Sequence, residues 1–313
     1  MSIAILLVLA FWLIGCSSKQ ELPQLKVLVW NIWHGGNDES LPSDGRPSVI
    51  DIIKISKADI VLMIETYGSA PLISDSTGLD YHLISSNLSI YSRFPITKQL
   101  AFSDSISSFN FGGVEILAFD SIPIAIFDTW LHYLPDTRLA PTHLHEDSIL
   151  AWEKRGSRND EVFRIINSIK TYLNNSKNVP VILGGDLNSH SHLDWTAATK
   201  DTFNHNGAVV NWTISKALTD VGLIDSYREI NPEPLKKLGK TWISGLDKNG
   251  KFGYTKEDRI DYIYYKGSKL KAISSESFTQ IPGEILEFRN KKIMYPSDHG
   301  FVLTTFEIEI NKK

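Results

Sequence analysis

The sequence has a single cysteine, Cys16, among 313 residues, so no disulfide can form within the chain and a disulfide-stapled fold is excluded. It also lacks an excess of basic residues. Lysine and arginine number 32 against 36 acidic residues, which gives a net charge of −4 and a pI of about 6.1. The net charge argues against a protein that binds nucleic acid through an overall excess of positive charge. A local basic patch is still compatible with this composition.

Uncharged apolar runs are short. The run at residues 3–14 is too short to span a bilayer securely, and it ends at Leu13-Ile-Gly-Cys16. That tetrapeptide resembles the lipobox of bacterial lipoprotein signal peptides, in which the signal is cut before a cysteine that carries lipid. We therefore expect a signal peptide at 1–16, a tether at 17–24 and a lipid anchor in the cell envelope, at the outer membrane or cell surface. No lysine or arginine precedes the run, unlike most signals, so a plain anchor or a buried segment is the alternative.

The remaining residues, 25–313, can bury one large α/β core, since 42% of the chain is hydrophobic. We find no internal repeat and expect one domain. Apolar runs and helical spacing predict strands at 25–30, 59–64, 81–84, 88–91, 114–119, 122–127, 179–184, 260–265, 269–278 and 300–310, and helices at 47–56, 161–173 and 212–221.

Several predicted strands end in residues that suit phosphate or metal chemistry. The segment Val179–Ser189 is the best example: a buried strand, a glycine pair expected to end it in a tight turn, then Asp186 and Asn188 on one side. A single carboxylate at a strand end is usually a cap. A series of such strand ends indicates a shared site. The polar residues at these strand ends are Asn31, Glu65, His132, Asp186 with Asn188, Asp261, and Asp298 with His299.

These strand ends stand in motifs that together resemble the endonuclease/exonuclease/phosphatase superfamily, the deoxyribonuclease I-like fold. The resemblance covers residues 25–310 and implies a four-layer α/β/β/α sandwich, in which two mixed β-sheets are flanked by helices. It also implies a metal-dependent phosphoric ester hydrolase. The motifs are Trp30-Asn-Ile-Trp33, Glu65, Ser92-Arg-Phe-Pro-Ile96, Gly185-Asp-Leu-Asn188, Arg259-Ile-Asp-Tyr262 and Ser297-Asp-His299.

The resemblance implies a divalent cation held by oxygen ligands. Glu65 would be the central ligand and Asn31 its neighbour, and Asp298 would join them directly or at a second metal position. We expect Mg²⁺, with Mn²⁺ or Ca²⁺ as alternatives, because Mg²⁺ accepts few protein ligands and keeps waters.

The other motif residues would act on the water and the phosphate. His299 is the expected general base, and Asp261 would fix its tautomer. Asp186 would position the attacking water or help to deprotonate it, while Asn188 and His132 would donate hydrogen bonds to the phosphate.

The segment Trp130-Leu-His-Tyr-Leu-Pro135 can be aligned with the family in two registers. It could present His132, as phosphodiesterase and phosphatase members do. It could instead present Tyr133, as abasic-site endonucleases do. We favour His132.

Two polar excursions, 135–158 and 189–206, are too long for plain connections. The second follows the strand that carries Asp186, so it should rim the pocket. His192, Asp194 and Trp195 could bind a sugar or headgroup there, and the alternative is an ordered surface loop with a buried Trp195.

The expected substrate is a small or lipid-headgroup phosphoester outside the cytoplasm, because the chain is mildly acidic and carries the lipobox-like signal. An exported nuclease acting on DNA or RNA is the alternative. A binding protein on a decayed hydrolase scaffold is disfavoured by the intact motif residues. We expect a monomer that contacts the membrane through its N-terminal lipid.

Overall fold

The computed structural model describes residues 22–100, 102, 106–243 and 257–309. The predicted signal peptide, Cys16 and most of the predicted tether lie outside the described residues. Within the described part of the chain, no helix is both long enough and apolar enough to cross a membrane.

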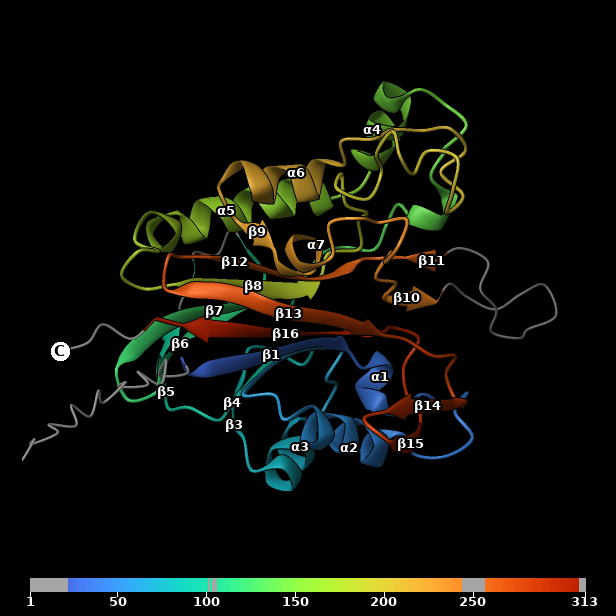
Figure 1. Ribbon diagram of the computed structural model, residues 1–313. Coiled ribbons are helices and arrows are strands. Elements are labelled where there is room, and N and C mark those ends of the chain that lie inside the picture. Colours follow the sequence, from blue (N-terminus) through green and yellow to red (C-terminus); the bar gives the residue numbers. More distant parts are fainter. Residues whose placement is uncertain (1–21, 101, 103–105, 244–256, 310–313) are drawn as a thin grey trace, which may run out of the picture.

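The helices and strands alternate along the chain as expected for an α/β protein (Figure 1). The helices are α1 Trp33–Gly36, α2 Arg46–Ser56, α3 Ala70–Thr77, the 3₁₀ helix Thr137–Leu139, α4 Glu146–Glu153, α5 Arg158–Asn174, α6 Thr213–Asp220 and α7 Ser226–Ile230. The strands are β1 Gln24–Asn31, β2 Ile60–Ile64, β3 Asp80–Leu83, β4 Leu88–Ser92, β5 Ile96–Leu100, β6 Phe111–Ala118, β7 Ile122–Trp130, β8 Val181–Asp186, β9 Ile224–Asp225, β10 Trp242–Ile243, β11 Glu257–Asp258, β12 Asp261–Lys266, β13 Leu270–Phe278, β14 Ile285–Phe288, β15 Lys291–Met294 and β16 Phe301–Ile308.

Two six-stranded sheets form the centre of the molecule. The first has the strand order β13-β16-β1-β2-β4-β3, and the second has the order β5-β6-β7-β8-β12-β9. Both are mixed, because β1 pairs with β2 and β7 with β8 in parallel while the other pairs are antiparallel. The parallel pairs matter for function, since parallel strands end at the same edge of a sheet.

The two sheets pack face to face between outer layers of helices. One apolar cluster fills the space between the sheets, with residues such as Val29, Leu62, Ile126 and Ile182. A second cluster joins the outer face of the first sheet to α2 and α3, and a third joins the outer face of the second sheet to α5 and α6. The predicted four-layer α/β/β/α sandwich is therefore confirmed.

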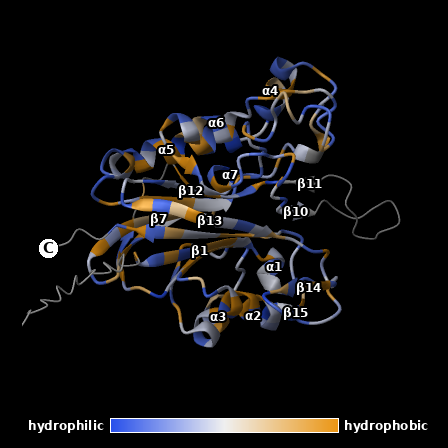
Figure 2. Cartoon of the chain, viewed as in Figure 1, coloured by the Kyte–Doolittle hydropathy of each residue, from blue (hydrophilic) through white to orange (hydrophobic). Residues whose placement is uncertain are grey.

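The sequence pattern of α5 explains its place in the outer layer. Val162, Ile165, Ile169 and Leu173 recur at helical spacing, and all four are buried against the second sheet. The opposite side of the helix is polar, so α5 shows both hydrophobic and hydrophilic colours in Figure 2.

The glycine pair in β8 has a different role from the one predicted. Gly184 and Gly185 do not end the strand; both pair with β12 and the strand continues to Asp186. A Cβ on Gly184 would lie 2.5 Å from a Val29 methyl carbon of the facing sheet, and one on Gly185 would lie 1.9 Å from the Thr129 carbonyl oxygen. Close packing of the backbone therefore requires these glycines.

The two polar excursions form one lobe beside the second sheet, seen around α4 in Figure 1. The excursion at 135–158 contains α4, which the sequence did not predict. Both excursions contribute to a separate apolar cluster, since Ile149 of α4 packs with Trp195, Val210 and Trp212. This small core explains why long polar segments are ordered here.

Candidate active site

Asn31 joins the two sheets at the edge where β1 and β8 end. Its side-chain Nδ2 donates to Glu65 Oε1 at 3.1 Å and to Asp186 Oδ2 at 3.2 Å. Glu65 directly follows β2, whereas Asp186 is the last residue of β8 in the other sheet. The predicted strand-end residues therefore meet across the interface between the sheets.

His299 lies between two buried carboxylates. Its Nδ1 is 3.0 Å from Asp261 Oδ2, and its Nε2 is 3.8 Å from Asp186 Oδ2. Asp261 begins β12 and lies opposite Asp186 in the antiparallel pairing of β12 with β8. Ligand atoms of these three side chains all lie within 4.8 Å of one another. The arrangement matches the predicted pairing of a general base with an orienting carboxylate.

The backbone around His299 is fixed by several hydrogen bonds. The His299 N–H donates to Ser297 Oγ, and the Ser297 hydroxyl donates to the Asn31 carbonyl. The His299 carbonyl accepts from Trp30 Nε1 at 3.2 Å and from the Tyr295 hydroxyl at 2.7 Å. Because Trp30 and Asn31 belong to β1, the position of His299 is tied to the strand that carries Asn31.

Asp186 and Asn188 form a tight turn after β8. Asp186 Oδ1 accepts from the Asn188 N–H at 2.9 Å, and Asn188 itself has a φ of 47°. The Asn188 side-chain Nδ2 donates to the Leu131 carbonyl at 2.9 Å and to Asp186 Oδ2 at 3.2 Å. This turn therefore links the end of β8 to the segment that follows β7.

Arg158 is a buried residue that lies in none of the family motifs. Its guanidinium donates to the carbonyls of Asn188 and Pro135. Burial lowers the pKa of Arg158, and the carboxylates of Glu153 and Asp186 oppose that shift. One side chain thus holds the turn after Asp186 and the segment after His132, and its position at the start of α5 gave no sequence signal of this role.

Glu65 lies in an uncommon backbone conformation, with a φ of 57°. Its N–H donates to Asn87 Oδ1 at 3.1 Å, and its Oε2 accepts from the His34 N–H at 3.0 Å. Asn87 and His34 were not predicted, because neither stands in a motif and His34 contributes only its backbone. These bonds aim the Glu65 carboxylate at Asn31.

The donor set fits a hard divalent cation. Glu65, Asp186 and Asp298 contribute carboxylate oxygens, the ligand type that Mg²⁺ prefers. The Asn31 amide oxygen accepts from the Trp33 N–H at 3.0 Å. Asp298 Oδ1 and Asp261 Oδ1 are buried and have no hydrogen-bond partner among the described residues. Asn31 Nδ2 lies between the two carboxylates of Glu65 and Asp186, where positive charge is favoured.

Burial and neighbouring charges shift the pKa values of the acidic and histidine side chains at the centre. Burial raises the pKa of Asp186 to about 7, with the Asp261 carboxylate adding to the shift and His299 opposing it. Burial also raises the pKa of Asp298 to about 6, and Glu65 adds to that shift. Burial alone would lower the pKa of His299, but attraction to Asp261 and Asp186 outweighs it, so the His299 pKa lies well above its ordinary value.

His132 and Tyr133 both lie at the exit of β7, and their rings stack with centroids 5.0 Å apart. The Leu134 N–H donates to His132 Nδ1 at 3.1 Å, so the proton of the neutral ring is on Nε2. Tyr133 is more exposed and makes ring contacts with Trp130 and His132. In this tautomer Nε2 of His132 is a hydrogen-bond donor.

His192, Asp194 and Trp195, which we predicted to bind substrate, are engaged within the protein. The His192 N–H donates to Ser215 Oγ at 2.8 Å, and its Nδ1 lies 2.9 Å from the same atom. Trp195 is only 5% exposed and stacks on His205 with ring centroids 3.8 Å apart. The structure thus has the alternative arrangement, an ordered loop with a buried Trp195, because the ring is needed in the core of the lobe.

Asp194 belongs to a buried network of two arginines and two aspartates. Arg259 Nε lies 2.8 Å from Asp194, and Arg259 Nη1 lies 2.6 Å from Asp225. Arg228 lies 2.6 Å from Asp194. Arg259 of the Arg-Ile-Asp-Tyr motif therefore ties the second excursion and α7 to the start of β12, two residues before Asp261.

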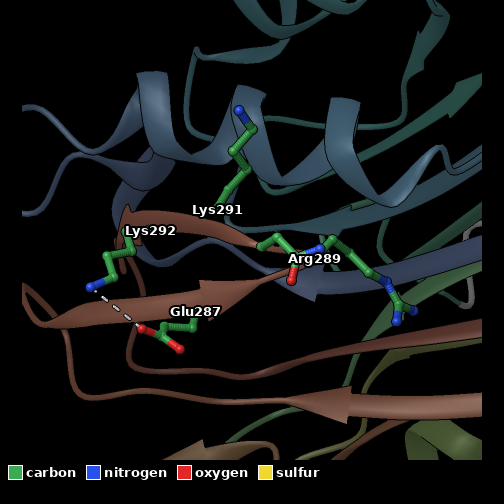
Figure 3. Close-up of a pocket in the computed structure, with 5 residues that line it drawn as sticks. Glu287, Arg289, Lys291 and Lys292 are labelled. Atoms are coloured by element: carbon green, nitrogen blue, oxygen red, sulfur yellow. Dashed lines mark ion pairs between the residues drawn. The ribbon is translucent and has the colours of Figure 1, made fainter.

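Figure 3 shows a surface cavity of about 640 Å³ on the β14–β15 hairpin, outside this centre. It is lined by Glu287, Arg289, Asn290, Lys291 and Lys292, and Lys292 lies 3.6 Å from Glu287. None of the predicted catalytic or metal residues lines it. Volume alone does not identify the site here; the buried Asp186, Asp261 and His299 cluster does.

The four-layer sandwich places a buried histidine and its flanking aspartates where the two sheets meet. The chain belongs to the Endonuclease/Exonuclease/phosphatase family, whose sequence profile matches residues 28–299. The activity class at this level is phosphoester hydrolase.

Individual proteins resemble the chain in sequence or in fold. The chain is 27% identical over 296 residues to the uncharacterized protein F14F9.5 of Caenorhabditis elegans, covering 90% of this chain and 91% of that protein. Its fold is similar to that of D. rerio TDP2 complexed with single strand DNA product (TM-score 0.59, 15% identity, 90% of this chain and 98% of the other). It is also similar to an AP endonuclease from Archaeoglobus fulgidus (TM-score 0.58, 16% identity, 91% and 100%).

Proposed function

We propose that the protein is a divalent-metal-dependent hydrolase of small phosphoesters, with His299 as general base. The observation that carries the proposal is the position of His299, whose Nδ1 contacts Asp261 while its Nε2 faces Asp186. A ring held in this way has one nitrogen anchored and the other directed at the centre. Because Asp261 and Asp186 raise its pKa, it can deprotonate a water only in its neutral form, which the positive charge of a bound cation nearby would favour.

Each residue then has a separate task. Asp261 keeps the His299 proton on Nδ1 and stabilises the imidazolium that forms when Nε2 accepts a proton. Asp186, next to Nε2, positions the water. His132 donates from Nε2 to a phosphoryl oxygen. Asn188, predicted as a second donor to the phosphate, has its Nδ2 engaged by Asp186 and the Leu131 carbonyl, so its role here is to hold Asp186 in place.

Asn31, Glu65 and Asp298 would hold the metal ion, with Mg²⁺ first and Mn²⁺ or Ca²⁺ as alternatives. When bound, the ion would supply positive charge for the phosphoryl oxygens and lower the barrier to departure of the alkoxide. The uncompensated Asp298 Oδ1 is the structural support for this assignment.

A small substrate is favoured over a nucleic acid by the charge around the centre. The loops that carry Asn31, Glu65 and His132, at 31–37, 65–69 and 130–134, contain no lysine or arginine. A long polyanion is held mainly by such cations. An exported nuclease is the second candidate, because D. rerio TDP2 complexed with single strand DNA product and an AP endonuclease from Archaeoglobus fulgidus share the fold at 15% and 16% identity.

Export, acylation at Cys16 and attachment to the cell envelope remain a proposal supported by Leu13-Ile-Gly-Cys16, and a monomeric state is proposed with it. Mass spectrometry of the mature N-terminus tests this. A chain that begins at lipid-modified Cys16 is expected, and an intact Met1, or Cys16→Ser protein with unchanged membrane association, would count against it.

The hydrolase proposal is tested by metal removal. Chelation should abolish turnover of a small-phosphoester panel and Mg²⁺ should restore it, whereas Glu65→Ala should bind Mg²⁺ more weakly by calorimetry and resist restoration. Glu233→Ala, an exposed acid, is the matched control. Full turnover in the presence of chelator would refute the metal-dependent mechanism. Hydrolysis of DNA but of no small phosphoester, with activity that falls steeply as the salt concentration rises, would favour the nuclease.

A further inference from the structure

A cavity of about 320 Å³ lies between α5, the residue after α6 and the end of β12. It is lined by apolar side chains such as Leu173 and Val221 and by the polar side chains of Asn167, Lys170, Asn174 and Lys266. The three polar residues from α5 recur at helical spacing and are exposed. The cavity thus combines an apolar lining with amide and ammonium groups.

The two lysines of the cavity retain donors for an anion. Lys266 Nζ donates to the Val221 carbonyl at 2.7 Å, which uses one of its three N–H groups and holds the ammonium at the cavity. Within the described residues, the Lys170 side chain has no hydrogen-bond or ion-pair partner. Asp220, the residue before Val221, is already paired with Lys216. The positive charge at the cavity therefore has little compensation from the protein.

This cavity lies at the end of the strands opposite to the catalytic centre. Lys266 ends β12 and pairs with Val181, the first residue of β8, whereas Asp261 at the other end of β12 pairs with Asp186. β8 has six residues, and a strand rises about 3.3 Å per residue. The cavity is therefore a separate feature from the catalytic centre.

Two loops extend the positive surface beyond the cavity. Lys269 Nζ donates to the Asn178 carbonyl at 3.3 Å, so the loop after β12 lies against the loop after α5. The segments 166–178, 220–224, 266–269 and 308–309 meet at this end and contain two acidic residues, Asp220 and Glu309. We call their four lysines the lysine face: Lys170, Lys177, Lys266 and Lys269.

The described chain begins beside the lysine face. The Pro23 carbonyl accepts from the Ile308 N–H at 2.9 Å, and the Glu309 N–H donates to the Lys269 carbonyl at 3.0 Å. Leu22 follows Cys16 by six positions, so their Cα atoms are at most about 22 Å apart. A bilayer that holds a lipid on Cys16 would therefore be close to the lysine face.

The distribution of charge favours an anionic partner at this end. The catalytic end has buried carboxylates, and its loops at 31–37, 65–69 and 130–134 contain no lysine or arginine. An anionic surface therefore attracts the lysine face and not the catalytic end. Lysines near an anionic bilayer each add to the attraction, and a cavity with an apolar lining accommodates part of a headgroup.

We propose that the lysine face is a docking surface for a bilayer that contains anionic phospholipid. Lys170 and Lys266 contact a lipid phosphate at the cavity, and Lys177 and Lys269 contact the neighbouring headgroups. Docking through this end leaves the catalytic end directed at the solvent. The proposal concerns attachment to a membrane and does not depend on the reaction proposed above.

The test measures binding to vesicles of phosphatidylcholine alone and of an equimolar mixture with phosphatidylglycerol. The full chain carries Cys16→Ser, so that no acyl chain dominates the binding. The mixed vesicles should bind more tightly, and Lys170→Gln with Lys266→Gln should reduce this preference by roughly twentyfold, about fivefold for each lysine. Lys170→Gln with Lys177→Gln, two exposed positions on and after α5, is a second pair with the same expected loss.

Lys291→Gln with Lys292→Gln is the matched control. It removes the same charge from the β14–β15 hairpin, which lies beside α1 at the catalytic end (Figure 1), and it should keep the preference for mixed vesicles. Thermal melting shows whether each variant is folded. Turnover of a small phosphoester without vesicles should be the same in all variants, because none of these lysines lies at the catalytic centre.

Three results would overturn the docking surface. The first is equal affinity of the Cys16→Ser chain for both kinds of vesicle, and the second is an equal loss in the lysine-face and hairpin variants. The third is binding to duplex DNA without any preference for the mixed vesicles. Absence of hydrolysis together with a preference that depends on Lys170 and Lys266 would refute the hydrolase and leave the docking surface in place.

Discussion

His299 Nδ1 lies 3.0 Å from Asp261 Oδ2, although the two residues are 38 positions apart and lead into strands of different sheets. Asp261 begins β12 of the second sheet, and His299 precedes β16 of the first. The contact therefore exists only when the two sheets are packed in register. Catalytic geometry in this fold depends on the apolar cluster between the sheets as well as on the motif residues.

Asp261→Asn should leave the fold intact and reduce kcat. An amide at this position can donate to Nδ1, which moves the ring proton to Nε2 and removes the base; a loss of roughly 10³-fold or more is expected by analogy with histidine–aspartate hydrolases. Asp201→Asn, an exposed acid, should have no effect. The measurement is kcat on the best small phosphoester, and an Asp261→Asn enzyme with wild-type kcat would show that Asp261 does not orient the base.

Arg158→Met should reduce kcat more than it raises KM. The loss leaves the carbonyls of Asn188 and Pro135 without their donor, so the turn after Asp186 and the segment after His132 lose their common support. Unfolding free energy should fall by on the order of 3 kcal/mol. Arg155→Met, an exposed arginine before α5, is the control. The positioning role of Arg158 would be contradicted if kcat fell equally in Arg158→Met and Arg155→Met. It would also be contradicted if Arg158→Met raised KM without lowering kcat.

The four-layer sandwich was implied by the resemblance of the motifs to a known superfamily. The strand-end residues themselves indicated that Asn31, Glu65, Asp186, Asp261 and His299 share a site. These features are local in sequence, since buried strands have continuous apolar runs and the polar residue at the end is visible. The helix α5 was predicted for the same reason, from its apolar stripe.

Contacts made by single residues outside the motifs could not be predicted from the sequence. Arg158 and Asn87 stand in no motif, and their roles depend on which carbonyls and N–H groups the fold brings to them. For Trp195 the sequence left two alternatives open, a contact with substrate and a buried ring, and the structure has the buried ring. Its burial comes from a small core shared with α4, and α4 itself has only a weak apolar pattern.

Trp195→Ala should act on stability rather than on substrate binding. The ring packs against His205 and Trp212 in the lobe, so truncation leaves a cavity that should cost about 3–5 kcal/mol. KM of the folded enzyme should change by roughly twofold or less, because the ring contacts no substrate. Leu235→Ala is the control, because Leu235 is exposed, and it should change neither the free energy of unfolding nor KM. A large KM effect with unchanged unfolding free energy would return Trp195 to the substrate site.

His205 gives the lobe a specific dependence on pH. Burial lowers the pKa of His205 from 6.5 to about 4, and the neighbouring His190 adds to the shift. The folded protein therefore keeps His205 neutral, while the unfolded chain binds a proton as the pH falls below 6.5. The contribution of neutral His205 to the free energy of unfolding is fully present above pH 6.5. It is lost as the pH falls from 6.5 to 4, at up to about 1.4 kcal/mol per pH unit.

The free energy of unfolding, measured by urea titration from pH 7.5 to 4.5, should thus fall more steeply in wild type than in His205→Phe. Phenylalanine keeps a ring against Trp195 but cannot bind a proton, so the difference between the two curves isolates His205. His143→Phe applies the same substitution at an exposed histidine and should follow the wild-type slope. Parallel curves for wild type and His205→Phe would mean that His205 is not held neutral. They would also mean that its Nδ1, which has no hydrogen-bond partner within the described part of the chain, has no consequence for folding.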